Sequence, residues 1–384
     1  MRANDTCARY PPAMQKVRTR KRAGTPASLT CSPVPERPDI HQIVLPLPDV
    51  SAHGGVATPP YVQVYLIDSQ PLTLIDTGPC TAASRAQLEA ALDGFGYGLA
   101  DIERVVVTHA HRDHMGLVQS IRDAGAGLEC LVHEADAHVV ESFPEDVRRR
   151  VAEMVPLFRE YGVPEELVER LHADAVDDFM VDASENEATV VDRILHDGDR
   201  VEWKDFAFDV RHSPGHTPGH ILLEDGDLGL LFTGDQIMGQ AIPYAENFYQ
   251  GELPVPGDPL RRRPRFRGLV ELRQSLRRLR GRPYKIFLPS YGGVIRRTER
   301  AIRDTLLYYD VRLQRIDRGL RHLAAMGQDV TAFEIWKALF PADEPLDDVR
   351  SQILMLIGAL DCLEDDGLLV TERRPDGVLT HHHR

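Results

Sequence analysis

The sequence of 384 residues is short of cysteines, of long apolar runs and of the usual serine-nucleophile motif. Its five cysteines are scattered, odd in number and never spaced Cys-x-x-Cys, which predicts reduced thiols in a cytoplasmic protein rather than a disulfide framework. No apolar run approaches the length of a membrane span, so no membrane partner is expected. No Gly-x-Ser-x-Gly segment occurs either, so a serine hydrolase of the nucleophile-elbow type is not indicated.

Positive charge is also scarce, because the net charge is −14 at pH 7. Binding to nucleic acid needs clustered lysines and arginines that contact phosphates, so a nucleic-acid partner is disfavoured. One exception is the segment 261–285, which holds eleven Arg and Lys residues against the single acid Glu271. We interpret it as a basic helix face that is solvated and paired with acids elsewhere, in preference to a phosphate-binding surface.

The first 38 residues are rich in arginine and proline and hold few acids or large apolar residues. A secretory signal needs an apolar middle, which is missing. We predict a disordered basic tail over 1–38. An organelle transit peptide and an overlong gene start, with Met14 as the true initiator, are the alternatives.

The most informative run reads THAHRDHMG from residue 108 to residue 116 and holds four candidate metal ligands within six residues. His109 and His111 are two apart, so an extended backbone places both imidazoles on one side. Asp113 and His114 would begin a helix and point at an adjacent position. The apolar run before them predicts a buried strand that ends at the ligands, which is the usual place for a site in a layered α/β protein. The run therefore predicts a metal centre rather than a plain turn.

Three further segments follow apolar or alternating stretches and end in polar side chains. Residues 213–220 read SPGHTPGH and carry His216. Residues 232–235 read FTGD and end in Asp235. Upstream, residues 74–78 read LIDTG and place Asp76 before a glycine turn.

Taken in this order, the motifs resemble those of the metallo-β-lactamase-fold hydrolase superfamily over about residues 40–300, and four of the family's five motifs are met. The resemblance implies an α/β fold, the metallo-β-lactamase αββα sandwich. The site residues that it implies are, for a first metal, His109, His111 and His216; for a second metal, Asp113 and His114; as a bridge between the two, Asp235; and, orienting the ligand loop by hydrogen bonds, Asp76.

The fifth motif departs from the family, which has Leu-Pro-x-His-Gly where this sequence reads LPSYG, with Tyr291 in the place of the histidine. A phenol has an ordinary pKa of about 10 and is a poor zinc ligand at neutral pH. Asp113, His114 and Asp235 still offer three ligands, the number that a catalytic zinc commonly keeps. We expect one or two Zn²⁺ ions with a weakened second site, and iron or manganese as alternatives. The competing hypothesis is that Tyr291 donates a hydrogen bond to an oxyanion or binds ferric iron as phenolate.

Residues 134–185 are predicted to form a mostly helical insertion. Its apolar residues recur at helical spacing, as at Val151, Met154 and Phe158. The insertion suits either the core of an extra helical pair or an apolar lid over the site, formed by Phe143, Met154, Phe158, Tyr161 and Phe179. Three aromatic residues follow Asp235 in a long connection and are candidate pocket residues or loop anchors: Tyr244, Phe248 and Tyr249.

From about residue 303 the pattern changes to helices that end in a hairpin. The capping box 331–334 opens one helix, another is predicted over about 345–364, and strands flank the turn 374–376. Three helices and a β-wing resemble a winged-helix domain, as in the branch typified by β-lactamase-like protein 2. We therefore divide the chain into the tail 1–38, a metallo-β-lactamase-fold domain over 39–302 and a winged-helix-like domain over 303–384.

The many acids of the carboxy-terminal domain do not suit contact with DNA phosphates, so we expect it to pack beside the active site or at a homodimer interface. The last histidines, His381 to His383, are interpreted as a mobile tail.

The resemblance implies a zinc-dependent hydrolase in which a metal-activated hydroxide, held by the catalytic carboxylates Asp113 and Asp235, attacks a small acyl substrate such as a thioester, ester or lactone. Two alternatives stay open. One is a metal-dependent ribonuclease or phosphodiesterase that uses the segment 261–285. The other is a non-catalytic metal-binding protein in which Tyr291 marks a degenerate second site.

Overall fold

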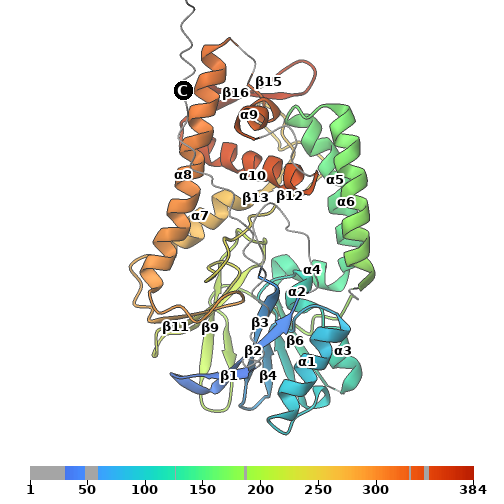
Figure 1. The fold of residues 1–384 in the computed structure, drawn as a ribbon, viewed down its shortest axis with the longest axis vertical. Helices are drawn as coiled ribbons and strands as arrows, with labels where there is room; N and C mark the ends of the chain where they lie inside the picture. Colours follow the sequence, from blue (N-terminus) through green and yellow to red (C-terminus); the bar gives the residue numbers. More distant parts are fainter. Residues whose placement is uncertain (1–30, 48–58, 126, 186–187, 328–329, 341–345) are drawn as a thin grey trace, which may run out of the picture.

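The computed structural model describes residues 31–47, 59–125, 127–185, 188–327, 330–340 and 346–384. Two β-sheets form the lower part of the molecule in Figure 1, and a mainly helical part lies above them. Residues 1–30 of the predicted tail fall outside the described residues. For residues 31–38 the prediction of a tail is wrong, because β1 (Cys31–Val34) pairs with β2 (Arg37–Pro46) at one edge of the sandwich.

The first sheet has the strand order β1-β2-β3-β4-β5-β6-β7. The pairs from β4 to β7 are parallel, so the carboxyl ends of these strands meet at one edge of the sheet. Beyond β1 and β2, its strands are β3 (Tyr61–Ile67), β4 (Thr73–Ile75), β5 (Arg104–Val106), β6 (Glu129–His133) and β7 (Arg193–Leu195).

The second sheet has the order β14-β11-β10-β9-β8. Only its β11–β14 pair is parallel; the other pairs among these strands are antiparallel. Its strands are β8 (Arg200–Glu202), β9 (Ala207–His212), β10 (Ile221–Asp225), β11 (Leu230–Gly234) and β14 (Ile286–Pro289).

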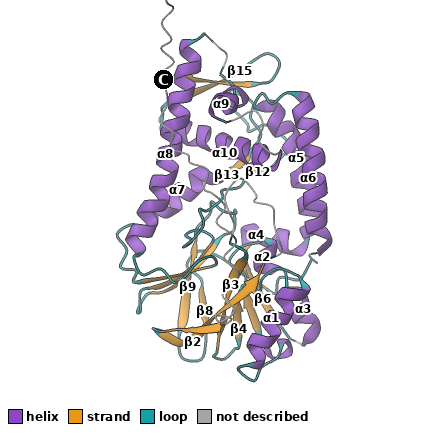
Figure 2. Cartoon of the chain, in the orientation of Figure 1, coloured by secondary structure: helices purple, strands orange, loops and turns teal. Residues whose placement is uncertain are grey.

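Several strands of both sheets are covered on both faces, which explains why β4, β11 and β14 are buried without alternation, whereas β2, β8 and β9 alternate. In and just after β5, Val106 faces the second sheet, whereas Val105 and Val107 face the outer helices. The helices α1 (Ala82–Asp93) and α3 (Val118–Ala124) cover the first sheet, and α7 (Gly268–Leu279) covers the second. The predicted αββα sandwich is confirmed (Figure 2).

The remaining helices belong mainly to the helical part of the molecule (Figure 1). Among the helices that are described, none combines the length and the apolarity needed to cross a bilayer. The remaining helices are α2 (Arg112–Met115), α4 (Glu134–Glu141), α5 (Phe143–Glu160), α6 (Glu165–Glu185), α8 (Thr298–Ala325), α9 (Ala332–Leu339) and α10 (Leu346–Asp365).

The helical insertion and the carboxy-terminal helices share one apolar core. Leu157 and Phe158 of α5 and Leu171 of α6 belong to the same buried cluster as Ile353 and Leu356 of α10. In Figure 1, α10 lies between α8 on one side and α5 and α6 on the other. The predicted domain boundary between residues 302 and 303 falls inside α8. The regions 39–302 and 303–384 contribute residues to the same buried apolar cluster.

The terminal hairpin is present, formed by β15 (Leu369–Arg373) and β16 (Leu379–His383). The interpretation of His381 to His383 as a mobile tail is wrong, because these residues pair with β15. The His381 side chain is buried and stacks on Tyr161 with ring centroids 5.9 Å apart. Burial lowers the pKa of His381 to about 3.

Arginines of the basic segment 261–285 pair with acids, as interpreted from the sequence, but Arg273 of its helix is buried rather than solvated. Arg265, in β13 (Arg265–Arg267), lies 2.5 Å from Asp361, and Arg273 lies 3.1 Å from Asp366. β13 itself pairs with β12 (Asn247–Tyr249), a strand within the long connection after Asp235 that the sequence does not indicate. Arg265 therefore joins this connection to α10, and Arg273 joins α7 to the end of α10.

Candidate metal centre

The polar side chains of the predicted site follow strands of both sheets. His109 and His111 follow β5, and Asp76 directly follows β4. In the second sheet, His216 follows β9 and Asp235 directly follows β11. Ligands from two sheets therefore meet at one edge of the sandwich.

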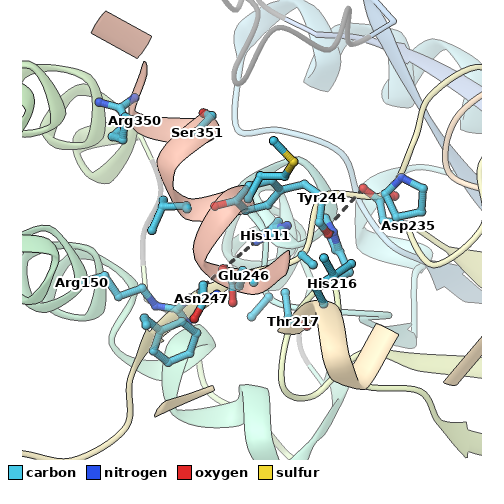
Figure 3. A pocket seen from close by; sticks show the side chains of 18 of the residues that line it. His111, Arg150, His216, Thr217, Asp235, Tyr244, Glu246, Asn247, Arg350 and Ser351 are labelled. Atoms are coloured by element: carbon cyan, nitrogen blue, oxygen red, sulfur yellow. Dashed lines mark hydrogen bonds and ion pairs between the residues drawn. The ribbon is translucent and has the colours of Figure 1, made fainter. Parts of the chain in front are cut away.

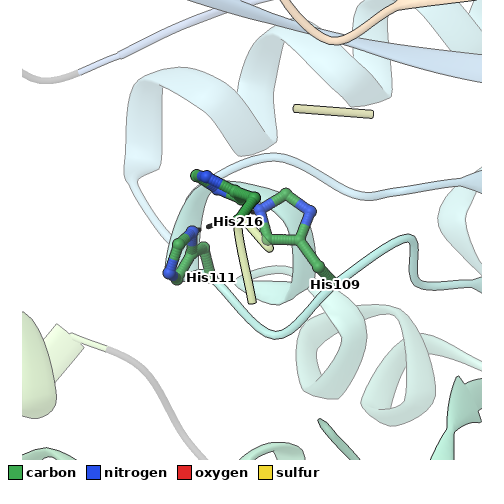
Figure 4. A group of neighbouring side chains, drawn as sticks. All are labelled: His109, His111 and His216. Carbon is green, nitrogen blue, oxygen red and sulfur yellow. Dashed lines mark hydrogen bonds between the residues drawn. The ribbon is translucent and has the colours of Figure 1, made fainter. Parts of the chain in front are cut away.

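Three imidazoles, those of His109, His111 and His216, lie around one point at this edge (Figure 4). Their ligand atoms lie within 4.8 Å of one another, and His109 Nε2 is 3.1 Å from His111 Nδ1. Two nitrogens on one tetrahedral zinc are about 3.3 Å apart, for Zn–N bonds of about 2.0 Å. The three side chains therefore have the spacing of metal ligands.

A second group shares His109 and adds His114 and Asp235. His114 Nε2 lies 3.5 Å from Asp235 Oδ1 and 3.4 Å from Asp113 Oδ2. Asp235 also reaches the first group, since its Oδ2 is 3.4 Å from His216 Nε2. The structure thus brings all six predicted ligand residues together, and Asp235 lies between the two groups.

Asp76 lies beneath the ligand loop and holds it through hydrogen bonds. Its Oδ1 accepts from the Thr108 amide at 2.7 Å, and its Oδ2 accepts from the Thr108 hydroxyl and from His114 Nδ1, each at 2.8 Å. Because the Thr108 hydroxyl donates to Asp76, it accepts from His109 Nδ1 at 3.1 Å. Asp76 has a φ of 60°, a left-handed conformation that is uncommon outside glycine and is found at functional sites. Both imidazoles are therefore held with Nε2 turned to the centre.

Glu246 and a backbone carbonyl hold the other two imidazoles. His111 Nε2 donates to Glu246 at 3.1 Å, and Arg150 donates to the same carboxylate at 2.7 Å. His216 Nδ1 donates to the Tyr244 carbonyl at 2.7 Å. Glu246 is a single acid in a connection without a motif, so the sequence does not indicate this role.

A buried carboxylate, Asp136 of α4, ties two ligand loops together. It accepts from the Ala110 amide at 3.0 Å, from the Thr217 hydroxyl at 2.7 Å and from the Gly219 amide at 2.6 Å. Ala110 and Thr217 are neighbours of the histidines of the first group in the sequence. Asp136 therefore sets the distance between the two loops, a role that only the fold reveals.

His220 supports the loop that carries Asp235. Its Nε2 accepts from the Asp235 amide at 3.1 Å. Gly234 has a φ of 48°, and a Cβ atom there would lie 2.6 Å from His220 Nε2. A glycine is therefore required for Asp235 to approach the histidines.

Three buried atoms that face the centre have no hydrogen-bond partner among the described residues: His114 Nε2, His216 Nε2 and Asp235 Oδ1. Buried polar atoms almost always have partners, so a group of three without one points to a ligand. Imidazole nitrogens and carboxylate oxygens are the donors that zinc and related divalent ions take. The residues present therefore fit a metal.

The charges at the centre also suit a cation. Burial and the neighbouring imidazoles lower the pKa of His109 well below its ordinary value, and burial with the neighbouring His111 lowers that of His216 to about 4. Both rings are thus neutral at pH 7, as metal ligands must be. At His114 the surrounding carboxylates, Asp113 first, outweigh burial and raise the pKa well above its ordinary value. The carboxylates therefore favour positive charge at this point.

Tyr291 lies beside the second group, and its hydroxyl donates a hydrogen bond to Asp113 Oδ2. Burial, together with the charge of Asp113, raises the pKa of Tyr291 well above its ordinary value. A phenol that keeps its proton does not favour the phenolate ligand of the competing hypothesis. It instead engages one oxygen of Asp113.

A cavity of about 450 Å³ opens against the ligand groups and is lined by His111, Asp113, His216, Asp235 and Tyr291 at this end (Figure 3). Its other walls are mostly apolar and come from α4, α5, α8, α10 and the connection after Asp235. Of the residues suggested by the sequence for a lid or a pocket, four line the cavity. The four are Phe143, Met154, Tyr244 and Phe248. Phe158, Tyr161 and Tyr249 lie in the helical core instead, and the side chain of Phe179 falls outside the described part of the chain.

A family model described as the metallo-beta-lactamase superfamily matches residues 57–291. A relative from Bacillus subtilis (strain 168), named "Probable metallo-hydrolase YqjP", is 29% identical over 290 residues, which are 73% of this chain and 81% of that protein. Hydroxyacylglutathione hydrolase GloC from Haemophilus influenzae is 27% identical over 136 residues, which are 35% of this chain and 50% of that enzyme. The chain thus spans about half the length of GloC.

Two solved structures share the fold over nearly the whole chain. A beta-lactamase domain protein from Burkholderia ambifaria has a TM-score of 0.70 at 20% identity, over 94% of this chain and 97% of that one. The family protein TTHA1429 from Thermus thermophilus has a TM-score of 0.64 at 22% identity, over 90% of this chain and 99% of that one. Since the family model matches more than half of a chain with this fold, the chain belongs to the metallo-beta-lactamase superfamily.

Proposed function

We propose that the protein is a metal-dependent hydrolase of small acyl substrates such as thioesters, esters or lactones, with zinc as its metal. One observation carries the proposal. Each imidazole of the two ligand groups has one nitrogen engaged by a neighbouring acceptor and the other turned to a common centre. Such outer hydrogen bonds fix the tautomer and orientation of metal-binding histidines.

Zinc at such a site supplies Lewis acidity and a hydroxide nucleophile at neutral pH. The chain supplies the rest. His109, His111 and His216 would hold the first ion, while His114, Asp113 and Asp235 would hold the second. Asp113 and Asp235 are also the carboxylates at the centre that can orient a water molecule and accept its proton. The apolar walls of the cavity exclude bulk water and hold the acyl group beside these residues.

Two observations support acyl substrates over phosphodiesters. The cavity is mostly apolar. The relative GloC is named for hydrolysis of hydroxyacylglutathione, an acyl thioester. Against a nuclease, the arginines Arg262, Arg265 and Arg273 of the basic segment pair with acids of the same chain.

The finer classification is also part of the proposal. The order of three helices and a hairpin, α8 to β16, supports a winged-helix-like domain and the branch of β-lactamase-like protein 2. We infer a small molecule, not nucleic acid or a membrane, as the partner, with a homodimer formed through the carboxy-terminal region. A cytoplasmic location is supported by the cysteines of the described residues, Cys31, Cys80, Cys130 and Cys362, which form no disulfide with one another.

The proposal is tested by elemental analysis of the purified protein, followed by a substrate panel. We expect bound zinc and hydrolysis of thioesters, esters or lactones, with little turnover of phosphodiesters or short RNAs. The His216→Ala variant is the control, because it removes a ligand without touching the cavity walls of the helical part. Bound metal without hydrolysis of any member of the panel would favour the non-catalytic alternative.

A further inference from the structure

The cavity beside the metal centre has two different ends. The ligand residues come from the loops of the sandwich, whereas α8 and α10 of the helical part close the opposite side. In Figure 3, Arg350 and Ser351 of α10 lie across the cavity from His216 and Asp235. A molecule that fills the cavity therefore touches both the metal centre and the helical part.

The acids of the helical walls already have partners. Asp146 accepts from Arg150 at 2.5 Å, and Glu246 accepts from the same arginine at 2.7 Å. Glu153 pairs with Arg263 at 2.7 Å. These carboxylates therefore offer little negative charge to a ligand.

Arg312 of α8 differs from these paired residues. Its guanidinium lies 3.6 Å from the centroid of the Tyr308 ring, and both side chains line the cavity. Within the described ranges, no carboxylate forms an ion pair with Arg312. Stacking on an aromatic ring fixes the orientation of a guanidinium and leaves its N–H donors available.

The surroundings of Arg312 make its charge unfavourable without an anion. Burial, with Arg315 nearby, lowers the pKa of Arg312, whereas Glu246 and Asp146 outweigh burial and raise that of Arg150. A partly buried charge without a counter-charge costs free energy that a bound anion recovers. Arg350 lines the same cavity but is already paired, with its guanidinium 3.0 Å from Asp174.

We propose that the substrate is an acyl compound with an apolar body and an anionic group, and that Arg312 binds this anionic group. This inference rests on the proposed function and deepens it. The reacting carbonyl lies at the ligand groups, the apolar body lies along Phe143, Met154 and Leu354, and the carboxylate or phosphate pairs with Arg312. Arg312 is then the residue that determines specificity, and it takes no part in bond cleavage.

The first test compares two esters of equal acyl length in the zinc-loaded full chain: para-nitrophenyl hexanoate and the para-nitrophenyl monoester of adipic acid. Suberic and sebacic monoesters, with their neutral counterparts, extend the series. We expect the wild type to prefer the carboxylate-terminated member of at least one pair. Arg312→Met should lower kcat/KM for that ester about 10-fold to 100-fold, as loss of a charge-assisted hydrogen bond predicts, and leave its neutral partner unchanged.

Two variants control for charge and for folding. Arg312→Lys keeps the positive charge and should keep part of the preference. Arg318→Met removes an exposed arginine from the same helix that does not line the cavity, and should behave as the wild type. An equal loss in both methionine variants would overturn the assignment to Arg312.

Dye binding separates this inference from the proposed function, because it needs no hydrolysis. Anilinonaphthalene sulfonate and the neutral N-phenylnaphthylamine differ by one anionic group, and both fluoresce in apolar cavities. Equal turnover of both esters, together with the same dye affinity in wild type and Arg312→Met, would overturn the inference. The proposal of a hydrolase would then remain valid. Absence of any ester turnover, with sulfonate binding that still depends on Arg312, would overturn the hydrolase and support the anion site.

Discussion

Two buried polar clusters in this protein differ in how their charges are arranged. At the edge of the sandwich, His114 Nε2, His216 Nε2 and Asp235 Oδ1 face one point and have no partner among the described residues. In the helical part, Arg265 donates to Asp361 at 2.5 Å and to Tyr161 at 3.0 Å, so that its charge is balanced inside the chain. This difference indicates that the first cluster binds a ligand, whereas the Arg265 cluster stabilises the fold.

Mutations in the two clusters should therefore have opposite effects on function and on stability. Removing a ligand from the centre should abolish function with a smaller loss of stability, because several ligand atoms face the centre without a partner among the described residues. Breaking the Arg265 cluster should cost stability and spare the metal, because its groups already satisfy one another.

The largest effect is expected from His109→Ala, since His109 belongs to both ligand groups. Loss of an outer partner typically costs about 10-fold to 100-fold in metal affinity or activity, and loss of a ligand itself should exceed that. Metal content and ester turnover measure the effect. Thermal unfolding of the metal-free proteins provides the comparison, and we expect a smaller loss of stability than Arg265→Met causes. Activity at the wild-type level in this variant would refute the assignment of the centre.

Arg265→Met should destabilise the fold by about 3–5 kcal/mol, because it leaves the Asp361 carboxylate buried and without its main partner. Urea unfolding measures the loss, while metal content per folded chain should stay the same. Adding Asp361→Leu to Arg265→Met should recover part of the stability. Full metal loss in the folded single variant would contradict the separation of the two clusters.

Glu246→Gln tests a residue that belongs to both kinds of contact, because Glu246 accepts from the ligand His111 and from Arg150. The neutral amide is a weaker acceptor for His111 and no longer balances Arg150, so metal affinity should fall about 10-fold to 100-fold. Competition with a chelator measures the affinity. Asp146→Asn also weakens a contact of Arg150 but does not touch a ligand, and we expect it to bind metal as the wild type does.

Tyr291→His tests the weaker half of the centre. An imidazole suits zinc, and the change also frees the Asp113 oxygen that now accepts from the phenol. We expect second-site affinity to rise about 10-fold, the lower end of the range for partners of metal ligands, with equal or higher activity. Tyr291→Phe should stay near the wild type. A large loss of activity in Tyr291→Phe would instead favour a hydrogen bond from the phenol to the reacting oxygen.

At neutral pH the smallest effect concerns His381, whose burial lowers its pKa to about 3 in the folded protein, against about 6.5 in an unfolded chain. Between these values the unfolded state binds the proton and the folded state does not. The contribution of His381 to the free energy of unfolding is therefore fully present above pH 6.5. It falls by about 1.4 kcal/mol per pH unit as the pH decreases towards 3. His381→Phe should remove that part of the slope in denaturant unfolding at pH 7, 6 and 5. An identical slope would show that the imidazole is solvated.

The sequence predicts the sandwich and the ligand residues because both depend on local patterns. The spacing of His109, His111, Asp113 and His114 is contained in six residues, and the strands before the ligands are apolar runs. Even the departure at Tyr291 is visible in the sequence, and the structure adds its contact with Asp113.

What the sequence does not predict depends on residues that meet only in the fold. Glu246 and Asp136 are single acids without a motif, and they reach the ligand loops from a connection and from α4. His381 looks like a polar tail, yet its place beside Tyr161 is set by a helix of the distant insertion. The strand Cys31–Val34 is recognisable only through its partner, β2.

The shared helical core also has a consequence for synthesis of the protein on the ribosome. Phe158 of α5 emerges almost 200 residues before Ile353 of α10, its companion in the same core. At usual rates of translation, α10 is synthesised on the order of 10 s or more after α5, so the apolar face of α5 lacks this packing partner during that time. In the later part of that interval the last ligand loop, which carries Asp235, has been made, more than 100 residues before Ile353, while the far wall of the cavity has not. We therefore expect nascent chains to be able to load metal before they can select a substrate, and to need a chaperone for the exposed face of α5.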